Sequence, residues 1–174
     1  MNKLITAVCL TFLSVTSANA SRLWWFEAGL GTSYIQTYND DTTADIRPTV
    51  FLAANKKFAD NWSIGVAGEL LLNKVFELDK SDNLLVWRLP NFNYEITEQL
   101  SINFYGGAAR YYREHPSFGI GAGVGSSYKL TDRWSIDFGA SYFSVDMSTS
   151  IPGDLALGKK DELVWASLLL KSRF

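Results

Sequence analysis

The chain has 174 residues, a formal net charge of −2 and an aromatic content of 14%. The near balance of 16 basic and 18 acidic residues excludes the concentrated positive charge expected of a nucleic-acid-binding protein. Beyond the first twenty residues no apolar run approaches the roughly twenty residues of a membrane-spanning helix, so the apolar residues must be dispersed along strands.

The first twenty residues have the features of a cleaved secretory signal. Lys3 gives a positive start, residues 4–15 are apolar, and Ala18-Asn19-Ala20 supplies small residues for cleavage. We therefore predict a signal peptide over residues 1–20 and one domain over residues 21–174. Because the only cysteine, Cys9, belongs to the signal peptide, the exported domain must be stable without disulfides.

Alternation of apolar with small or polar residues begins with the first predicted strand. Leu30 and Tyr34 share one face of this strand, while Glu27 and Ser33 share the other, since successive side chains of a strand point to opposite faces. The pattern recurs over 62–70, 118–130, 134–142 and 164–174. A face made of glycine and small polar residues fits a narrow lumen better than a water-exposed surface.

Three related segments, over 56–64, 94–102 and 128–136, connect these predicted strands. Each has an apolar residue, a short polar turn with Asp or Glu, and then an aromatic residue or Leu followed by Ser-Ile. This spacing is typical of a short hairpin, and its repetition indicates one repeated unit. With a strand on each side, the three hairpins predict an all-β fold: an eight-stranded antiparallel transmembrane β-barrel with up-and-down meander topology.

The fourth predicted strand is irregular. Phe92 and Tyr94 define a lipid face that would also place Arg88 in lipid, whereas Leu85 and Trp87 favour the opposite register. Pro90 stands between the two patterns, and a proline within a strand marks a bulge or an edge. We predict a register-correcting bulge at Pro90, near the outer rim, with a local opening of the barrel wall for lipid entry as the alternative.

Charged residues of both signs fall on the predicted lumen face. Side chains fill the interior of an eight-stranded barrel, so we expect these charges to pair with one another and not to line a small-solute channel. This predicted lumen polar network consists of Glu27, Arg47, Glu69, Asp137, Lys171 and Arg173. No segment has the spacing of an organised calcium loop, and we predict no metal and no cofactor.

Aromatic residues concentrate near the predicted strand ends, as in the two girdles of a membrane barrel. One group, near the short turns and chain ends, consists of Trp24, Trp25, Phe26, Phe58, Trp62, Tyr94, Trp134 and Phe174. The other group, near the longer connections, consists of Tyr34, Tyr38, Phe76, Tyr112, Phe118 and Tyr142.

The last predicted strand ends in Phe174, preceded by alternating apolar residues. This resembles the C-terminal signature that the barrel assembly machinery recognises in bacterial outer-membrane proteins. With the Leu-Thr-Asp-Arg-Trp-Ser-Ile turn at 130–136 and the Gly-Ile-Gly-Ala-Gly-Val-Gly strand at 119–125, residues 21–174 resemble the OmpA/OmpX-like eight-stranded outer-membrane β-barrel family.

The resemblance implies a monomer in the bacterial outer membrane with a structural or surface-interaction role through extracellular loops. The implied partners are outer-membrane lipid and lipopolysaccharide, the barrel assembly machinery with Phe174 as its assembly signal, and an extracellular ligand that the sequence does not name. No nucleic acid is expected.

An enzymatic alternative rests on His115-Pro116-Ser117 with Glu114 beside it. The size and the His-x-Ser spacing resemble those of PagL-type lipid A deacylases, which use a Ser and a His with a Glu. The parity of the strand argues against it, because His115 and Ser117 would face the lumen with Gly119 and not the lipid. The favoured interpretation is therefore a barrel without catalysis, with a lipid A-modifying acyl hydrolase as the alternative.

Overall fold

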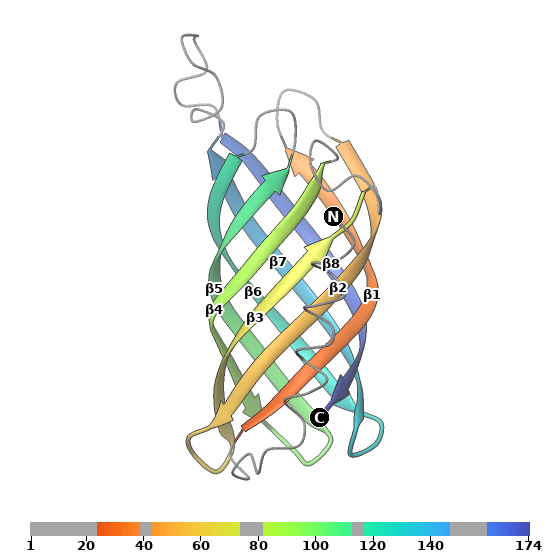
Figure 1. Cartoon of the computed structure of the whole chain (residues 1–174), viewed down its shortest axis with the longest axis vertical. Coiled ribbons are helices and arrows are strands. Elements are labelled where there is room, and N and C mark those ends of the chain that lie inside the picture. The colour runs from red at the N-terminus through yellow and green to blue at the C-terminus, as the bar shows by residue number, and fades with distance from the viewer. Residues whose placement is uncertain (1–23, 39–42, 74–81, 113–116, 147–159) are drawn as a thin grey trace, which may run out of the picture.

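The computed structural model describes residues 24–38, 43–73, 82–112, 117–146 and 160–174, which form eight strands. Each strand is antiparallel to the next, and β8 pairs with β1, so the sheet closes into a barrel (Figure 1). The predicted all-β meander is confirmed. The strands are β1 (Trp24–Tyr38), β2 (Thr43–Lys57), β3 (Trp62–Leu71), β4 (Asn83–Glu95), β5 (Leu100–Tyr112), β6 (Ser117–Lys129), β7 (Trp134–Asp146) and β8 (Lys160–Arg173).

The three repeated segments form the short turns β2–β3, β4–β5 and β6–β7. They lie at one end of the barrel, with the C-terminus, and this end is called the turn end below (Figure 1). In the last two turns a threonine closes the loop: Thr97 Oγ1 accepts from the amide of Leu100 at 2.9 Å, and Thr131 Oγ1 from that of Trp134 at 3.1 Å. Short polar turns of this kind join neighbouring antiparallel strands directly, so the repeats set the meander topology.

The alternation along each strand separates two faces. Inward residues such as Ser33 and Leu163 are fully buried, while outward residues such as Leu30 and Ile120 are mostly exposed. Within the part of the chain that the structure describes, no helix is long and apolar enough to cross a bilayer.

The predicted bulge at Pro90 is confirmed, although it lies in the middle of β4 and not near a rim. The pairing of β4 with β5 shifts register between Arg88 and Asn91, and the pairing with β3 shifts between Gly65 and Ala67. Both Arg88 and Asn91 are consequently buried on the inner face, while Leu89 between them is exposed outside. The bulge reconciles the two contradictory patterns of this strand, because it allows its polar residues to face inward on both sides of Pro90.

The hydrophobic core lies inside the barrel and consists of two clusters. The smaller cluster contains Phe51, Ala53, Ala67 and Leu169. The larger cluster, called the apolar set below, lies toward the end opposite the turns and contains Ile35, Leu71, Leu84, Val86, Tyr105, Ala109, Tyr111, Phe143, Val145, Leu163 and Trp165.

One predicted girdle residue is wrong. Trp25 faces inward, is largely buried, and donates from Nε1 to Glu27 Oε1 at 3.0 Å. Its neighbours Trp24 and Phe26 point to the other side of β1, as alternation requires. The predicted signal peptide, residues 1–20, lies outside the described residues.

Candidate functional site

A buried lysine joins two carboxylates in the half of the interior nearest the turn end. Lys171 Nζ on β8 lies 3.1 Å from Glu27 Oε2 on β1 and 2.5 Å from Asp137 Oδ2 on β7. Alternation brings the three together: register pairs Lys171 with Gly29 and Ser135, each two positions from a carboxylate on the same inner face. The carboxylate of Asp137 also accepts from Ser127 Oγ at 2.6 Å and from Ser135 Oγ at 3.3 Å.

A second ion pair lies near the middle of the interior. Arg88 on β4 contacts Glu69 on β3, and both side chains are almost completely buried. The Arg88 guanidinium carbon lies 4.2 Å from the Tyr105 ring centroid and 5.0 Å from that of Phe51, so two aromatic faces accompany the charge. The Tyr105 hydroxyl lies 2.5 Å from Ser141 Oγ, which links β5 with β7 across the interior.

These five charged residues, Glu27, Glu69, Arg88, Asp137 and Lys171, are called the polar set. Burying a lone charge is costly, and each member of the polar set lies against an opposite charge. Strand parity identified four of them, while Arg88 was left ambiguous because the bulge at Pro90 hides its parity.

The other two residues of the predicted lumen network lie near the barrel ends. Arg47, near the end opposite the turns, donates to the backbone carbonyl of Asp82, and its Nε lies 3.5 Å from Asp45 Oδ2. Arg173, at the turn end, is exposed, and its guanidinium carbon lies 4.2 Å from the Trp25 ring centroid. Neither forms an ion pair with the polar set among the described residues.

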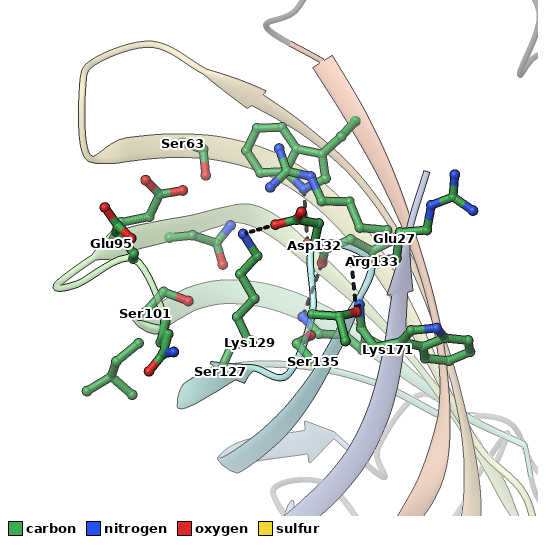
Figure 2. Close-up of a pocket in the computed structure, with 18 of the residues that line it drawn as sticks. Glu27, Ser63, Glu95, Ser101, Ser127, Lys129, Asp132, Arg133, Ser135 and Lys171 are labelled. Atoms are coloured by element: carbon green, nitrogen blue, oxygen red, sulfur yellow. Dashed lines mark hydrogen bonds and ion pairs between the residues drawn. The ribbon is translucent and has the colours of Figure 1, made fainter.

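A polar cavity of about 100 Å³ opens at the turn end beside Glu27 and Lys171 (Figure 2). Its outer wall comes from the β4–β5 and β6–β7 turns and includes the pair Lys129–Asp132, whose Nζ and Oδ1 lie 2.9 Å apart. Cationic and anionic side chains occur together in its lining: Lys129, Arg133, Lys171 and Arg173 with Glu27, Glu95, Glu98 and Asp132. The cavity therefore has no excess of one charge with which to select an anion or a cation.

Sequence reasoning missed the apolar set. The rings of Phe143 and Trp165 pack at a tilt with centroids 5.1 Å apart inside the barrel, and Leu84 and Leu163 are fully buried there. The signal was present, because the alternating apolar residues that end in Phe174 leave Leu163 and Trp165 on the other, inner face of β8.

The residues of the enzymatic alternative are only partly described. Glu114 and His115 lie outside the described residues, whereas Ser117, the first residue of β6, is fully buried and on the inner face. A nucleophile that cleaves a membrane lipid must meet it on the outer wall, so the position of Ser117 gives the alternative no support. The roles of Glu114, His115 and Ser117 stay a prediction.

No protein-family model matches this sequence, and no curated protein is significantly similar to it. Solved structures do match. Ail, the attachment invasion locus protein of Yersinia pestis, solved in complex with the heparin analogue sucrose octasulfate, superposes with a TM-score of 0.56 at 13% identity, over 87% of this chain and 99% of that one. Neisserial surface protein A superposes with a TM-score of 0.52 at 12% identity, over 87% of this chain and 97% of that one.

The likeness to these proteins is one of fold. The chain has the architecture of the small eight-stranded outer-membrane barrels, and the predicted resemblance to the OmpA/OmpX-like class is confirmed at that level. Because the superpositions include 99% and 97% of those two chains, the match extends over the complete barrel.

Proposed function

We propose that this protein is a monomeric integral outer-membrane barrel with a non-conducting interior and a structural or surface-interaction role. The observation that carries the proposal is the broad apolar surface on the outside of the barrel, while buried ion pairs lie inside it. A soluble barrel would carry mostly polar side chains on its outer face.

The outward apolar residues occur on strands all around the barrel. Soluble monomers rarely expose contiguous apolar patches larger than a few hundred Å², so such a surface needs a cover. A bilayer is the natural cover for a closed barrel, because closure satisfies every strand edge. Representative exposed residues are Leu30 on β1, Ile46 on β2, Val66 on β3, Leu89 on β4, Phe104 on β5, Ile120 on β6, Phe138 on β7 and Leu168 on β8.

The interior supports a structural role more than transport. The polar set occupies part of the lumen with ion pairs between neighbouring strands, and the apolar set fills the opposite half with buried side chains. An ion crossing this interior would have to break buried ion pairs and then pass through the apolar set, and both steps are unfavourable.

The short turns support a periplasmic position for the turn end, as small outer-membrane barrels have short periplasmic turns and longer extracellular loops. The opposite end of the barrel would then face the exterior, where a surface partner would meet it. The backbone of Phe174 also helps to close the barrel, because its amide and carbonyl form hydrogen bonds with Phe26 where β8 meets β1 at the turn end. This contact is consistent with a role of Phe174 in barrel assembly.

Reconstitution tests the proposal. The full domain, refolded into phosphatidylcholine vesicles, should show heat-modifiable mobility on gels and protease protection of its strands, and planar bilayers containing it should show no steady single-channel conductance. A tag inserted between Asp60 and Asn61 should be hidden on intact cells, whereas one between Gly153 and Asp154 should be labelled. Regular conductance steps would overturn the non-conducting role, and the reverse labelling would invert the topology.

A further inference from the structure

Arg110 is a cation on the outer wall of the barrel. It belongs to β5, where its neighbours Ala109 and Tyr111 are buried inside, so alternation directs Arg110 outward. It pairs in register with Leu85 on β4 and with Phe118 on β6. An arginine on a lipid-facing wall needs a partner, because the hydrocarbon region supplies none.

Two aromatic rings hold the guanidinium. Its central carbon lies 4.7 Å from the Tyr112 ring centroid and 5.3 Å from the Phe118 ring centroid. The Nε of Arg110 is buried and has no hydrogen-bond partner, and no carboxylate pairs with Arg110 among the described residues. The rings can hold the plane of the guanidinium, yet they satisfy none of its N–H groups.

The height of Arg110 on the wall matches the edge of the bilayer. Strand β5 begins at Leu100 beside a short turn, and Arg110 stands ten positions farther along. A tilted strand crosses the hydrocarbon layer in about 9–11 residues, so Arg110 lies where hydrocarbon gives way to headgroups. At this depth an arginine is tolerated far better than at the bilayer midplane.

We propose that Arg110, Tyr112 and Phe118 form a binding site on the outer wall for a phosphate of an outer-leaflet lipid, in this membrane the phosphorylated sugar headgroup of lipid A. A guanidinium presents paired N–H donors that match phosphate oxygens, and the aromatic rings pack against the first methylenes of the acyl chains. This site rests on the membrane topology proposed above.

Lys56 provides the contrast. It also faces outward beside an aromatic ring, with its Nζ 5.3 Å from the Trp24 ring centroid, but at the turn end. A single ring and a long flexible stem let an ammonium reach the interface water by itself. Lys56 is therefore the matched control: a cation at the other rim, without the two-ring clamp.

The test compares the unfolding midpoint of the refolded domain in three sets of vesicles: phosphatidylcholine alone, with bisphosphorylated lipid A, and with dephosphorylated lipid A. Wild-type protein and Lys56→Gln should be stabilised by the bisphosphorylated form alone. Arg110→Gln should lose this stabilisation, with apparent lipid A affinity roughly 10- to 100-fold weaker, as for a lost charged hydrogen-bond pair. Native mass spectrometry should show the same loss of bound lipid A.

Arg110→Lys and Tyr112→Leu keep the test decisive if Arg110→Gln folds poorly, because each preserves part of the site and should retain intermediate affinity. Equal lipid A dependence in wild type and Arg110→Gln would overturn the site. If inorganic phosphate, at the same concentration as the lipid phosphate, displaced lipid A from the Arg110 site, the proposal that the ligand is a lipid would be overturned. A wild-type protein that fails to insert into any vesicle would instead refute the proposed membrane location, a result separate from insertion without lipid A dependence.

Discussion

The polar set and the apolar set occupy the same narrow lumen, yet they fill it by different means. Toward the turn end, Lys171 joins carboxylates contributed by β1 and β7, and each charge depends on a partner from another strand. Toward the opposite end, the rings of Phe143 and Trp165 pack at a tilt among buried aliphatic side chains, and no single partner is essential. The stability of the first region requires that every buried charge has a partner, while the stability of the second requires that the side chains fill the available volume.

The boundary between the two regions lies at Tyr105. Its ring belongs to the apolar set and also lies against the Arg88 guanidinium, while its hydroxyl contacts Ser141. A phenol can join the two chemistries because it has an apolar face and a polar tip. The comparison predicts that substitutions on the two sides of Tyr105 will differ in kind as well as in size.

The largest effect is expected for Glu69→Gln. The substitution preserves shape but removes the only carboxylate that contacts Arg88 among the described residues, leaving a buried cation without its counter-charge. Breaking one partner of a buried pair costs about 3–5 kcal/mol. Urea unfolding of the domain from phospholipid vesicles, followed by tryptophan fluorescence, would measure the loss.

The control for Glu69→Gln is the double variant Glu69→Leu with Arg88→Met. It removes both charges and supplies apolar volume, and such replacements are often neutral or stabilising. The double variant should therefore be much more stable than the single one. If both were equally destabilised, volume and not pairing would govern the polar set, and the contrast between the two regions would fail.

In the apolar set, Leu163→Ala should cost about 2–5 kcal/mol, because it opens a cavity in a fully buried cluster. Leu168 on the same strand is the matched control, since its side chain is 43% exposed and faces outward. Leu168→Ala should cost less, as lipid chains can fill the space. The same unfolding assay would show the difference, and an equal loss at both positions would mean that the inner and outer faces are misassigned.

At the boundary, Tyr105→Phe should cost about 1 kcal/mol, the usual net value of one hydrogen bond. The ring remains for the apolar set and for Arg88, while Ser141 loses its partner. Adding Ser141→Ala to Tyr105→Phe should restore part of the loss, since it removes the unsatisfied hydroxyl. A loss as large as that of Glu69→Gln would show that the hydroxyl stabilises the ion pair and is not a local link.

The strands and turns could be predicted from sequence because they depend on local patterns. The alternation around Leu30 and Val124 set the two faces, and the three turn repeats set the meander. Pro90 predicted the bulge, since proline removes one ladder hydrogen bond wherever it falls.

The contents of the lumen could be predicted only in part. Charged inward residues can be recognised because a buried charge needs a partner, whereas inward apolar residues such as Phe143 and Trp165 can be recognised only from strand parity. Partner choice also depends on the strand register: Arg88 pairs with Glu69 on the neighbouring strand, and Arg47 donates to the carbonyl of Asp82 instead of joining the network. Gly123 is a local case, as it pairs in register with Tyr105 on the neighbouring strand, and a Cβ there would lie 2.5 Å from the Tyr105 ring.

The smallest effect is expected at the rim of the polar region, in the exposed pair Lys129–Asp132. The hydrogen bond from Lys129 lowers the pKa of the Asp132 carboxyl below its ordinary value, and its charge adds to the shift. A carboxyl with a lowered folded-state pKa contributes stability above its unfolded pKa, and the contribution disappears as pH falls through the folded value. Asp132→Asn should therefore leave unfolding unchanged below that acidic window and produce at most a slight loss at neutral pH, since water and salt screen exposed pairs. Parallel urea titrations of wild type and Asp132→Asn at neutral and acidic pH, with and without added salt, would measure this. A large salt-insensitive loss at neutral pH would mean that the pair behaves like the buried charges of the polar set, and that pairing matters as much at the water-exposed rim as it does inside the barrel.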